Sequence, residues 1–297
     1  MKFFTSLLLL VSVVGCSTFK KKEEAKAYAP QIAFEVTEGI RYPESIIYSD
    51  KHKAFFVSNV ASGDQLEKKS LGFISKISPD GKIVEAKWFS GLRAPKGLLV
   101  LGDDLYVTDI NRVVKINILS KKIIKTFQHK GTKFLNDLAV DNEGHIYVSD
   151  MFSDVIYRIE KNKMVNWLKD PRVAGCNGLF TDGKEHLIAV RWGVNIDQKS
   201  PLPHSRGDVT VIPLANKTDI TNMKEIQGHL DGIAVDNKGT LWISDWVFGD
   251  IYTMTKQGKT QKMFNLGYGT ADLTIAKELN LLAVPQMNDS KLIFIKL

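Results

Sequence analysis

The chain has 297 residues, of which 44% are hydrophobic and 25% are charged, and this ordinary balance excludes wholesale disorder. Its length suffices for one large β domain or two ordinary ones. The formal net charge is +7, but the basic residues beyond the N-terminal segment are scattered singly among acids. No basic stripe with interleaved aromatic residues is present, so we predict no binding to nucleic acid.

The first 15 residues predict an export signal. Lys2 precedes an apolar run over residues 3–15 that is too short to span a bilayer as a helix. The run ends in Val-Val-Gly-Cys, which resembles the lipobox of bacterial lipoproteins. That resemblance implies cleavage before Cys16 and attachment of lipid to this cysteine. An ordinary signal peptide or an uncleaved anchor is the alternative.

Residues 16–30 follow as the lipidated cysteine and a polar, lysine-rich tether. Ser17 after the cysteine resembles the pattern of outer-membrane lipoproteins. We therefore expect a protein of the bacterial cell envelope, facing the periplasm, that meets the membrane only through its lipid. Cys176 then has no partner in the chain, which predicts a buried thiol and no internal disulfide.

Residues 31–297 repeat one pattern. NDLAVDNEGHIYVSD from residue 136 and DGIAVDNKGTLWISD from residue 231 both run from an apolar strand through an Asp-Asn-x-Gly turn into an alternating strand. Weaker copies begin at residues 44, 96, 177 and 271, so the base unit is about 40 residues. Six copies of four short strands predict an all-β fold, a six-bladed β-propeller.

The two ends of this repeat region are expected to meet. The last copy has room for only three strands before Leu297, whereas IAFEV at Ile32–Val36 alternates like a strand ahead of the first copy. We predict that this strand completes blade six and closes the ring. Copies one and four carry insertions at residues 61–71 and 192–207, between their second and third strands. Such loops lie on the face where first strands begin, so both should overhang the mouth of the central channel.

When the six copies are aligned, the residue two positions before the first apolar residue of the first strand should lie at this mouth in every blade. We call this set the column; its members are Glu44, Lys96, Asn136, Asn177, Asp231 and Ala271. Its two carboxylates and two carboxamides offer hard oxygen ligands, which suit Ca²⁺ or Mg²⁺ better than Zn²⁺. Turn capping explains Asn and Asp at these positions individually, but it accounts less well for Glu44 in register with them.

Residues around the column resemble a known family. EGIRYPES around Glu44, FLNDLAVD around Asn136, CNGLF around Asn177 and LDGIAVDNKGTLW around Asp231 are similar to the senescence marker protein/gluconolactonase (regucalcin-like) family. The similarity covers residues 38–297 and extends more distantly to diisopropyl fluorophosphatases and paraoxonases. It implies a six-bladed propeller in which these four side chains hold one divalent cation, with Ca²⁺ favoured over Zn²⁺ or Mg²⁺.

The family hydrolyses lactones, arylesters or organophosphates, so the resemblance implies a metal-dependent hydrolase of a small-molecule ester or lactone, expected as a monomer. The cation would polarise the carbonyl or phosphoryl oxygen, and Asp231 would act as base or nucleophile. Asn136 and Asn177 would be ligands that also orient the substrate, with Glu44 as the anchoring ligand.

Two residues depart from the family pattern. Phe134 stands where sugar-lactonase members have a substrate-contacting Arg, which favours a more apolar ester or lactone. Lys96 brings an ammonium into the column, close to the expected cation. It could bind a substrate carboxylate, pair with Glu44 in place of the metal, or extend outward, and we expect the outward position.

Several further residues are candidates near the mouth. Arg191 and Trp192 could bind an anionic or ring-bearing substrate, and His204 or His229 could assist proton transfer. The same repeats also fit a non-catalytic, NHL-like propeller that binds a protein, glycan or small ligand. Three acids that end second strands are expected to stabilise the blades by hydrogen bonds: Asp109, Asp150 and Asp245.

Overall fold

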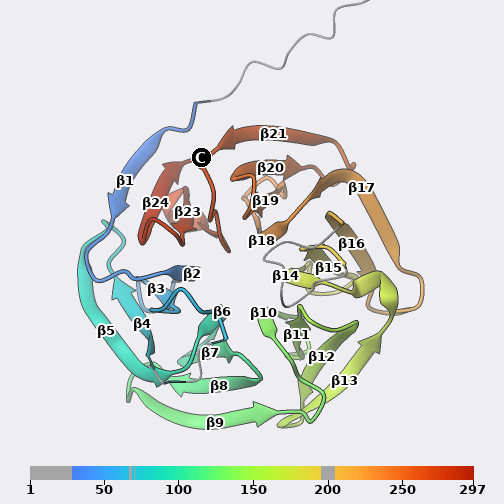
Figure 1. The fold of residues 1–297 in the computed structure, drawn as a ribbon, viewed down its shortest axis with the longest axis horizontal. Helices are drawn as coiled ribbons and strands as arrows, with labels where there is room; N and C mark the ends of the chain where they lie inside the picture. The colour runs from blue at the N-terminus through green and yellow to red at the C-terminus, as the bar shows by residue number, and fades with distance from the viewer. Residues whose placement is uncertain (1–28, 67–68, 70, 195–204) are drawn as a thin grey trace, which may run out of the picture.

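The computed structural model describes residues 29–66, 69, 71–194 and 205–297. They form six antiparallel sheets of four strands each, arranged around a central channel (Figure 1), which confirms the six-bladed β-propeller. Across these ranges no helix has the length and apolar character needed to cross a membrane. The predicted export signal, Cys16, most of the tether and His204 lie outside the described residues.

Every blade runs from an innermost strand at the channel to an outermost strand at the rim. Blade one consists of β2 (Pro43–Ser49), β3 (Ala54–Asn59), β4 (Gly72–Ile77) and β5 (Ile83–Leu92). Blade two consists of β6 (Pro95–Leu101), β7 (Asp104–Asp109), β8 (Arg112–Asn117) and β9 (Lys122–Gln128). Blade three consists of β10 (Leu135–Val140), β11 (Ile146–Asp150), β12 (Val155–Glu160) and β13 (Lys163–Lys169).

Blades four to six complete the ring. Blade four consists of β14 (Cys176–Thr181), β15 (His186–Arg191), β16 (Gly207–Pro213) and β17 (Thr221–Gly228). Blade five consists of β18 (Leu230–Val235), β19 (Leu241–Asp245), β20 (Asp250–Met254) and β21 (Thr260–Asn265). Blade six consists of β22 (Thr274–Ala276), β23 (Leu281–Gln286), β24 (Lys291–Lys296) and β1 (Ile32–Val36). Two short 3₁₀ turns, η1 (Pro171–Val173) and η2 (Lys277–Leu279), lie between strands.

The N-terminal strand closes the ring as predicted. β1 pairs antiparallel with β24, and Figure 1 shows β1 as the outermost strand of the last blade. Ile32 faces Ile295 and Val36 faces Leu292 in this pairing. The first and last strands are thus joined through backbone hydrogen bonds, which leaves no open sheet edge between them.

Aromatic pairs fill the wedges between neighbouring blades. In blade three, Tyr147 on the second strand meets Trp167 on the outer strand edge to face, with ring centroids 4.7 Å apart. Both side chains are buried in the apolar cluster shared with blade four. Burying side chains of this size contributes about 2–3 kcal/mol each. Blades one, two and five contain the equivalent pairs Phe56–Trp88, Tyr106–Phe127 and Trp242–Phe264, whereas blade six pairs Phe34 on its outer strand with Phe294 on its third strand.

Blade four has no such pair. Register places Ile188 on β15 where blade three has Tyr147, because Ile188 faces Phe180 as Tyr147 faces Ala139. The outer strand β17 contains no aromatic residue. The wedge between blades four and five therefore differs from the others.

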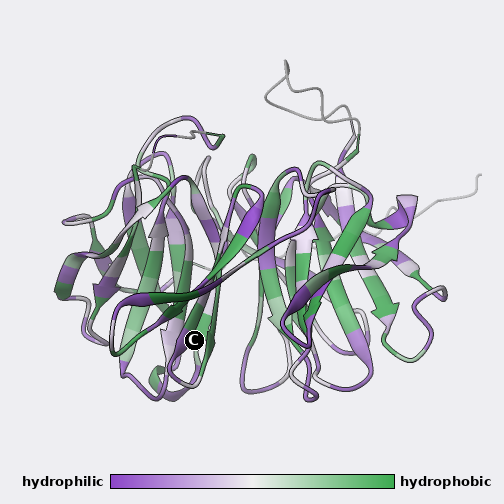
Figure 2. Cartoon of the chain, turned by 90° about the horizontal axis from the view of Figure 1, so that it is seen from below, coloured by the Kyte–Doolittle hydropathy of each residue, from purple (hydrophilic) through white to green (hydrophobic). Residues whose placement is uncertain are grey.

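Both insertions join a second strand to a third, as predicted, at β3–β4 and β15–β16. A side view shows apolar residues concentrated along the strands and polar residues in the loops at both ends of the blades (Figure 2). The core is thus a ring of apolar layers between blades, and the loops carry the polar chemistry.

Candidate active site

A β-bulge places each polar column residue. Asn136 lies in a register shift between Leu135 and Leu138, and Asp231 in the matching shift between Leu230 and Ile233. The same shift occurs at the column position of blades one, two and four. Bulges re-aim side chains, and here the side chains of all six column positions are buried.

Glycine beside the column allows the innermost strands to approach closely. A Cβ atom on Gly178 would lie 2.3 Å from the carbonyl oxygen of Asp231, and one on Gly232 would lie 2.5 Å from Oδ1 of Asp272. Any side chain at either position would force the strands apart. These glycines therefore keep the column residues of neighbouring blades near one another.

Two acids that end second strands hold the segments leading into the column, and the third holds the loop that follows its own strand, which confirms the expected hydrogen-bonding role. Asp109 accepts hydrogen bonds from the two amides at residues 93–94, each at 2.9 Å. Asp150 does the same for the amides at residues 133–134, at 2.8 and 3.0 Å. Asp245 accepts from Val247 N and Phe248 N at 3.0 and 2.9 Å.

Two oxygen atoms of the column are buried and have no hydrogen-bond partner among the described residues: Oε2 of Glu44 and Oδ1 of Asn177. The amide nitrogen of Asn177 donates to Oδ1 of Asp231 at 3.1 Å and to the carbonyl oxygen of Leu230 at 3.2 Å, which leaves its own oxygen free. An unsatisfied buried polar atom costs about 1–3 kcal/mol. Hard cations bind such oxygen atoms, so the donor set fits a divalent cation.

Two more carboxylates lie at this level, and the sequence interpretation missed them. Asp137 accepts backbone hydrogen bonds from Leu138 and Leu179, each at 2.7 Å. Asp272 accepts from the Ser45 hydroxyl at 2.5 Å. Both side chains are buried, and each residue directly follows a column position, in NDLAV and ADLTI. That adjacency was the available signal.

The electrostatics of the site are dominated by excess buried negative charge. Burial raises the pKa of Glu44, Asp231 and Asp272 well above the usual carboxyl range, and repulsion among the carboxylates adds to the shift. Burial also raises the pKa of Asp137 to about 7. A bound cation would oppose these shifts, because it stabilises the ionised carboxylates.

Lys96 does not extend outward, and that expectation was wrong. Its side chain is fully buried, and Nζ donates to the carbonyl oxygens of Gln65 and Ala94, each at 3.1 Å. Nζ also lies 4.4 Å from the ring centroid of Phe134. The loop at residues 61–66 and the Phe134 ring therefore occupy the path to solvent. Burial lowers the pKa of Lys96 to about 8, although the Glu44 carboxylate opposes this shift.

Lys96 also does not replace a metal at Glu44. Over the part of the chain that the structure describes, no ion pair joins these two side chains, since the ammonium is directed at backbone carbonyls instead. Its donation to Gln65 ties the first insertion to blade two across the mouth. Of the three roles that the sequence allows for Lys96, only the binding of a substrate carboxylate stays a prediction.

Aromatic side chains from blades three, four and five lie beside the column. Phe134 stacks on Phe152 at 4.4 Å and is buried. Trp192 lies 5.5 Å from both the His229 ring and the Trp246 ring, and the Trp192 carbonyl oxygen lies 3.0 Å from Nδ1 of His229. The walls near the predicted substrate residues are thus apolar.

Arg191 has its ionic partner within blade four, and Cys176 is buried in the same blade. The Arg191 guanidinium forms an ion pair with Asp208 at 2.7 Å and donates to the carbonyl oxygen of Ala174 at 3.2 Å. An anionic substrate would compete with Asp208 for this group. Cys176 is a buried thiol, as expected, and burial raises its pKa far above the ordinary value.

A separate cluster of possible ligands lies at the opposite end of blade four. Ligand atoms of Asp182, Glu185 and His186 lie within 4.8 Å of one another. Asp182 Oδ1, however, accepts three backbone hydrogen bonds of its own turn, at 2.7–3.0 Å, and Oδ2 lies 3.0 Å from the His186 ring. These contacts account for the cluster as a turn structure.

Fold and site together define a six-bladed propeller with a buried, oxygen-rich cluster at one mouth of its channel. Residues 42–271 match the sequence profile of the family described as "SMP-30/Gluconolactonase/LRE-like region". The chain belongs to this family. A search of curated protein sequences finds no match.

Solved structures share the fold at low sequence identity. A gluconolactonase from Xanthomonas campestris superposes with a TM-score of 0.66 at 14% identity, covering 86% of each chain. Virginiamycin B lyase from Staphylococcus aureus superposes with a TM-score of 0.61 at 16% identity, covering 89% of this chain and 98% of the lyase. A chain of the nidogen/laminin complex gives 0.58 at 14% identity, covering 77% and 92%.

Proposed function

We propose that this chain is a divalent-cation-dependent hydrolase of a lactone or ester, in which Ca²⁺ is the favoured ion. The observation that carries the proposal is the column itself, where two buried oxygen atoms, on Glu44 and Asn177, have no hydrogen-bond partner within the described part of the chain. Membership of a family that includes gluconolactonases supports the reaction class. The excess carboxylate charge supports the cation.

Glu44, Asn136, Asn177 and Asp231 would hold the ion, which when bound supplies electrophilic stabilisation of a carbonyl or phosphoryl oxygen. Asp231 is proposed to take the proton of the attacking water or to attack the substrate directly. Asn177 fixes the orientation of this carboxylate through the 3.1 Å hydrogen bond to its Oδ1. Asn136 would orient the substrate from the neighbouring blade.

We further propose that the substrate is less polar than a sugar lactone. Phe134 occupies the position of a sugar-contacting Arg, and its ring contacts both the Lys96 ammonium and the Phe152 ring. No hydrogen-bond donor can come from its side chain. An acyl chain or aromatic ring would match the apolar wall that Phe134, Met151 and Trp192 form. Binding of a substrate carboxylate by Lys96 would require its contacts to Gln65 and Ala94 to open.

The test is hydrolysis of a panel of aliphatic lactones, sugar lactones and arylesters, with and without a chelator. Asp231→Asn should lower kcat/KM by roughly a hundred- to ten-thousand-fold, and chelation should abolish activity until Ca²⁺ is restored. Asp219→Asn, an exposed change far from the column, is the matched control. Activity that is indifferent to both Asp231→Asn and chelation would sink the mechanism. Absence of both activity and cation binding would favour the non-catalytic binding propeller.

We also propose that lipid at Cys16 anchors the protein in the bacterial envelope, on the outer membrane and facing the periplasm. The support is the Val-Val-Gly-Cys sequence after the apolar run. Labelled fatty acid should enter the wild-type protein and not Cys16→Ala, which should move from the membrane fraction to the soluble periplasm. Equal labelling of Cys16→Ala would contradict the anchor.

A further inference from the structure

A pocket of about 800 Å³ opens between blades four and five. It lies on the face opposite the column. Its rim includes the turns at residues 182–185 and 236–239, which follow the innermost strands β14 and β18, whereas the column residues of these blades lie at the beginnings of the same strands. The volume is within the range of small-molecule sites, about 300–1,000 Å³. Nothing in the proposed hydrolase uses this face.

The pocket exists because blade four lacks the aromatic pair that fills other wedges. Ile188 stands in place of the aromatic on the second strand, and Met223 is the large apolar residue that the outer strand offers to the pocket. Both side chains are partly exposed, as are Phe180 and Val235, which also line the space. One blade earlier, Tyr147 and Trp167 are buried in the corresponding wedge.

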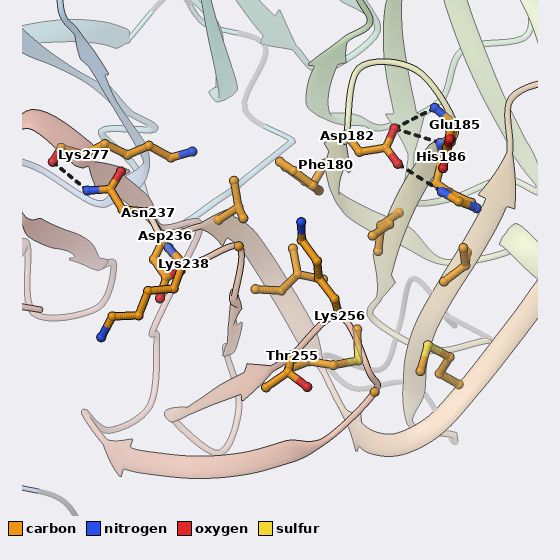
Figure 3. A pocket seen from close by; sticks show the side chains of 18 residues that line it. Phe180, Asp182, Glu185, His186, Asp236, Asn237, Lys238, Thr255, Lys256 and Lys277 are labelled. Carbon is orange, nitrogen blue, oxygen red and sulfur yellow. Dashed lines mark hydrogen bonds and ion pairs between the residues drawn. The ribbon is translucent and has the colours of Figure 1, made fainter.

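Lysine ammonium groups face this apolar floor. Figure 3 shows the Lys256 side chain extending towards Phe180, and the Lys277 side chain extending towards the same space from the other side. Among the described residues neither ammonium takes part in an ion pair or hydrogen bond. A Cβ atom on Gly239 would lie 2.7 Å from Cε of Lys256, so the lysine stem packs against a turn that has no side chain there.

Three acids line the rim. Glu185 lies beside Asp182 and His186 in the turn cluster described above, and the other two acids are held by hydrogen bonds of the protein. Asp182 is held by the amides of its own turn, as described above. Asp236 Oδ1 accepts from the amides of Lys238 and Thr240, at 2.8 and 2.9 Å, and its Oδ2 accepts from Nε1 of Trp242 at 3.1 Å. Both carboxylates serve structure, and both have less capacity for a ligand than the two lysines.

We propose that this pocket binds a small organic anion with an apolar body, a ring or an alkyl chain. The apolar body would lie against Phe180, Ile188 and Met223, and the anionic head would lie between Lys256 and Lys277. This arrangement, an apolar floor with a few converging polar groups, is that of small-molecule sites in general. The site is separate from the column and does not depend on the proposed hydrolysis.

Fluorescence of anilinonaphthalene sulfonate, an apolar anion, tests the proposal on the complete folded chain. The wild type should bind this probe, and laurate should displace it whereas dodecanol and dodecylamine should displace it at least about tenfold less well. Ile188→Tyr copies the residue of blade three and should fill the pocket, lowering affinity at least about tenfold. Lys256→Ala combined with Lys277→Ala should lower affinity for laurate and leave affinity for dodecanol unchanged.

Controls locate the binding. Lys259→Ala changes a lysine of the same blade that does not line the pocket and should bind the probe like the wild type, and Asp231→Asn at the column should also retain binding. Binding that persists in a folded Ile188→Tyr protein, or that is lost in Asp231→Asn, would overturn the site. If Ile188→Tyr fails to fold, the double lysine variant decides: unchanged laurate affinity would refute the proposal, and a selective loss for anions would support it.

Discussion

The column and the wedges between blades are both built from six equivalent positions, but they use them differently. Wedge positions carry the same chemistry in blades one, two, three and five, where a pair of aromatic side chains buries apolar surface against the next blade. Column positions carry a different side chain in almost every blade, and two of their oxygen atoms have no hydrogen-bond partner among the residues that the structure describes. Residues that recur at the same position in several blades pack the ring together, and residues that differ from the repeat form the candidate ligand sites.

The largest effect is expected from breaking a filled wedge. Trp167→Ala should lower the free energy of unfolding by about 3–5 kcal/mol, because it removes a buried ring that packs edge to face on Tyr147. Urea denaturation measures this loss. Trp167→Phe keeps an aromatic ring and should cost less than half as much. A loss below about 1 kcal/mol for the alanine variant would show that the pair does not hold the wedge.

Removing one charge from the column should affect the cation more than the fold. Glu44→Gln should weaken Ca²⁺ binding at least about a hundredfold, near 2.7 kcal/mol, since it replaces a charged ligand by a neutral one. Isothermal titration measures the affinity. The unfolding free energy without Ca²⁺ should not fall, because burial and repulsion already disfavour the Glu44 charge. Glu278→Gln, at an exposed acid, is the control, and equal affinities would contradict the assignment of Glu44.

Without cation, stability should fall as pH rises. Burial raises the folded-state pKa of Glu44, Asp137, Asp231 and Asp272, so the folded protein keeps protons that the unfolded chain has already lost. The window runs from about pH 4, the unfolded value, through the value of about 7 for Asp137. Thermal unfolding in chelator should give a lower Tm at the upper end of this window than near its lower end.

Ca²⁺ should reverse this trend by stabilising the ionised carboxylates, and should therefore raise Tm more at the upper end of the window. The difference in unfolding free energy is expected to be on the order of a few kcal/mol. Stability that increases with pH in chelator would mean that these carboxylates are ionised and satisfied without a cation.

The smallest effect concerns Lys96. Lys96→Met should strengthen Ca²⁺ binding by about tenfold, near 1.4 kcal/mol, because it removes an ammonium from the column at similar volume. It also removes the positive charge that is predicted to bind a substrate carboxylate, so KM for an anionic substrate should rise. Titration and kinetics measure both effects, with Lys122→Met on the outer strand as the control. Weaker Ca²⁺ binding in Lys96→Met would mean that the lysine supports the ligand cluster.

Repetition made the fold readable from sequence, but it hid parts of the site. Copies aligned by their turns predict strand number, ring closure and the polar column, because those features depend on local pattern. The position of Lys96 depends on a loop from another blade and on Phe134, which no local pattern reveals. Asp137 and Asp272 were missed because a bulge, and not simple strand alternation, sets which side chains reach the site.

The pocket was invisible in sequence for a related reason. Ile188 is an ordinary strand residue on its own, and only the pairing register shows that it replaces an aromatic. Its consequence also depends on the outer strand, more than thirty residues away in the chain. The missing aromatic ring at Ile188 predicts a pocket only after the equivalent positions of the blades have been matched in the structure.

Closure of the ring by β1 dictates an order of events during folding. Residue 32 pairs with residue 295, so the last blade cannot be completed until nearly the whole chain is available. Before that moment blades one and six expose strand edges and apolar wedge surface, which is the state most open to aggregation. Contacts between such distant residues also slow folding. A shortened chain that ends before β24 would lose its partner for β1 and remain an open arc.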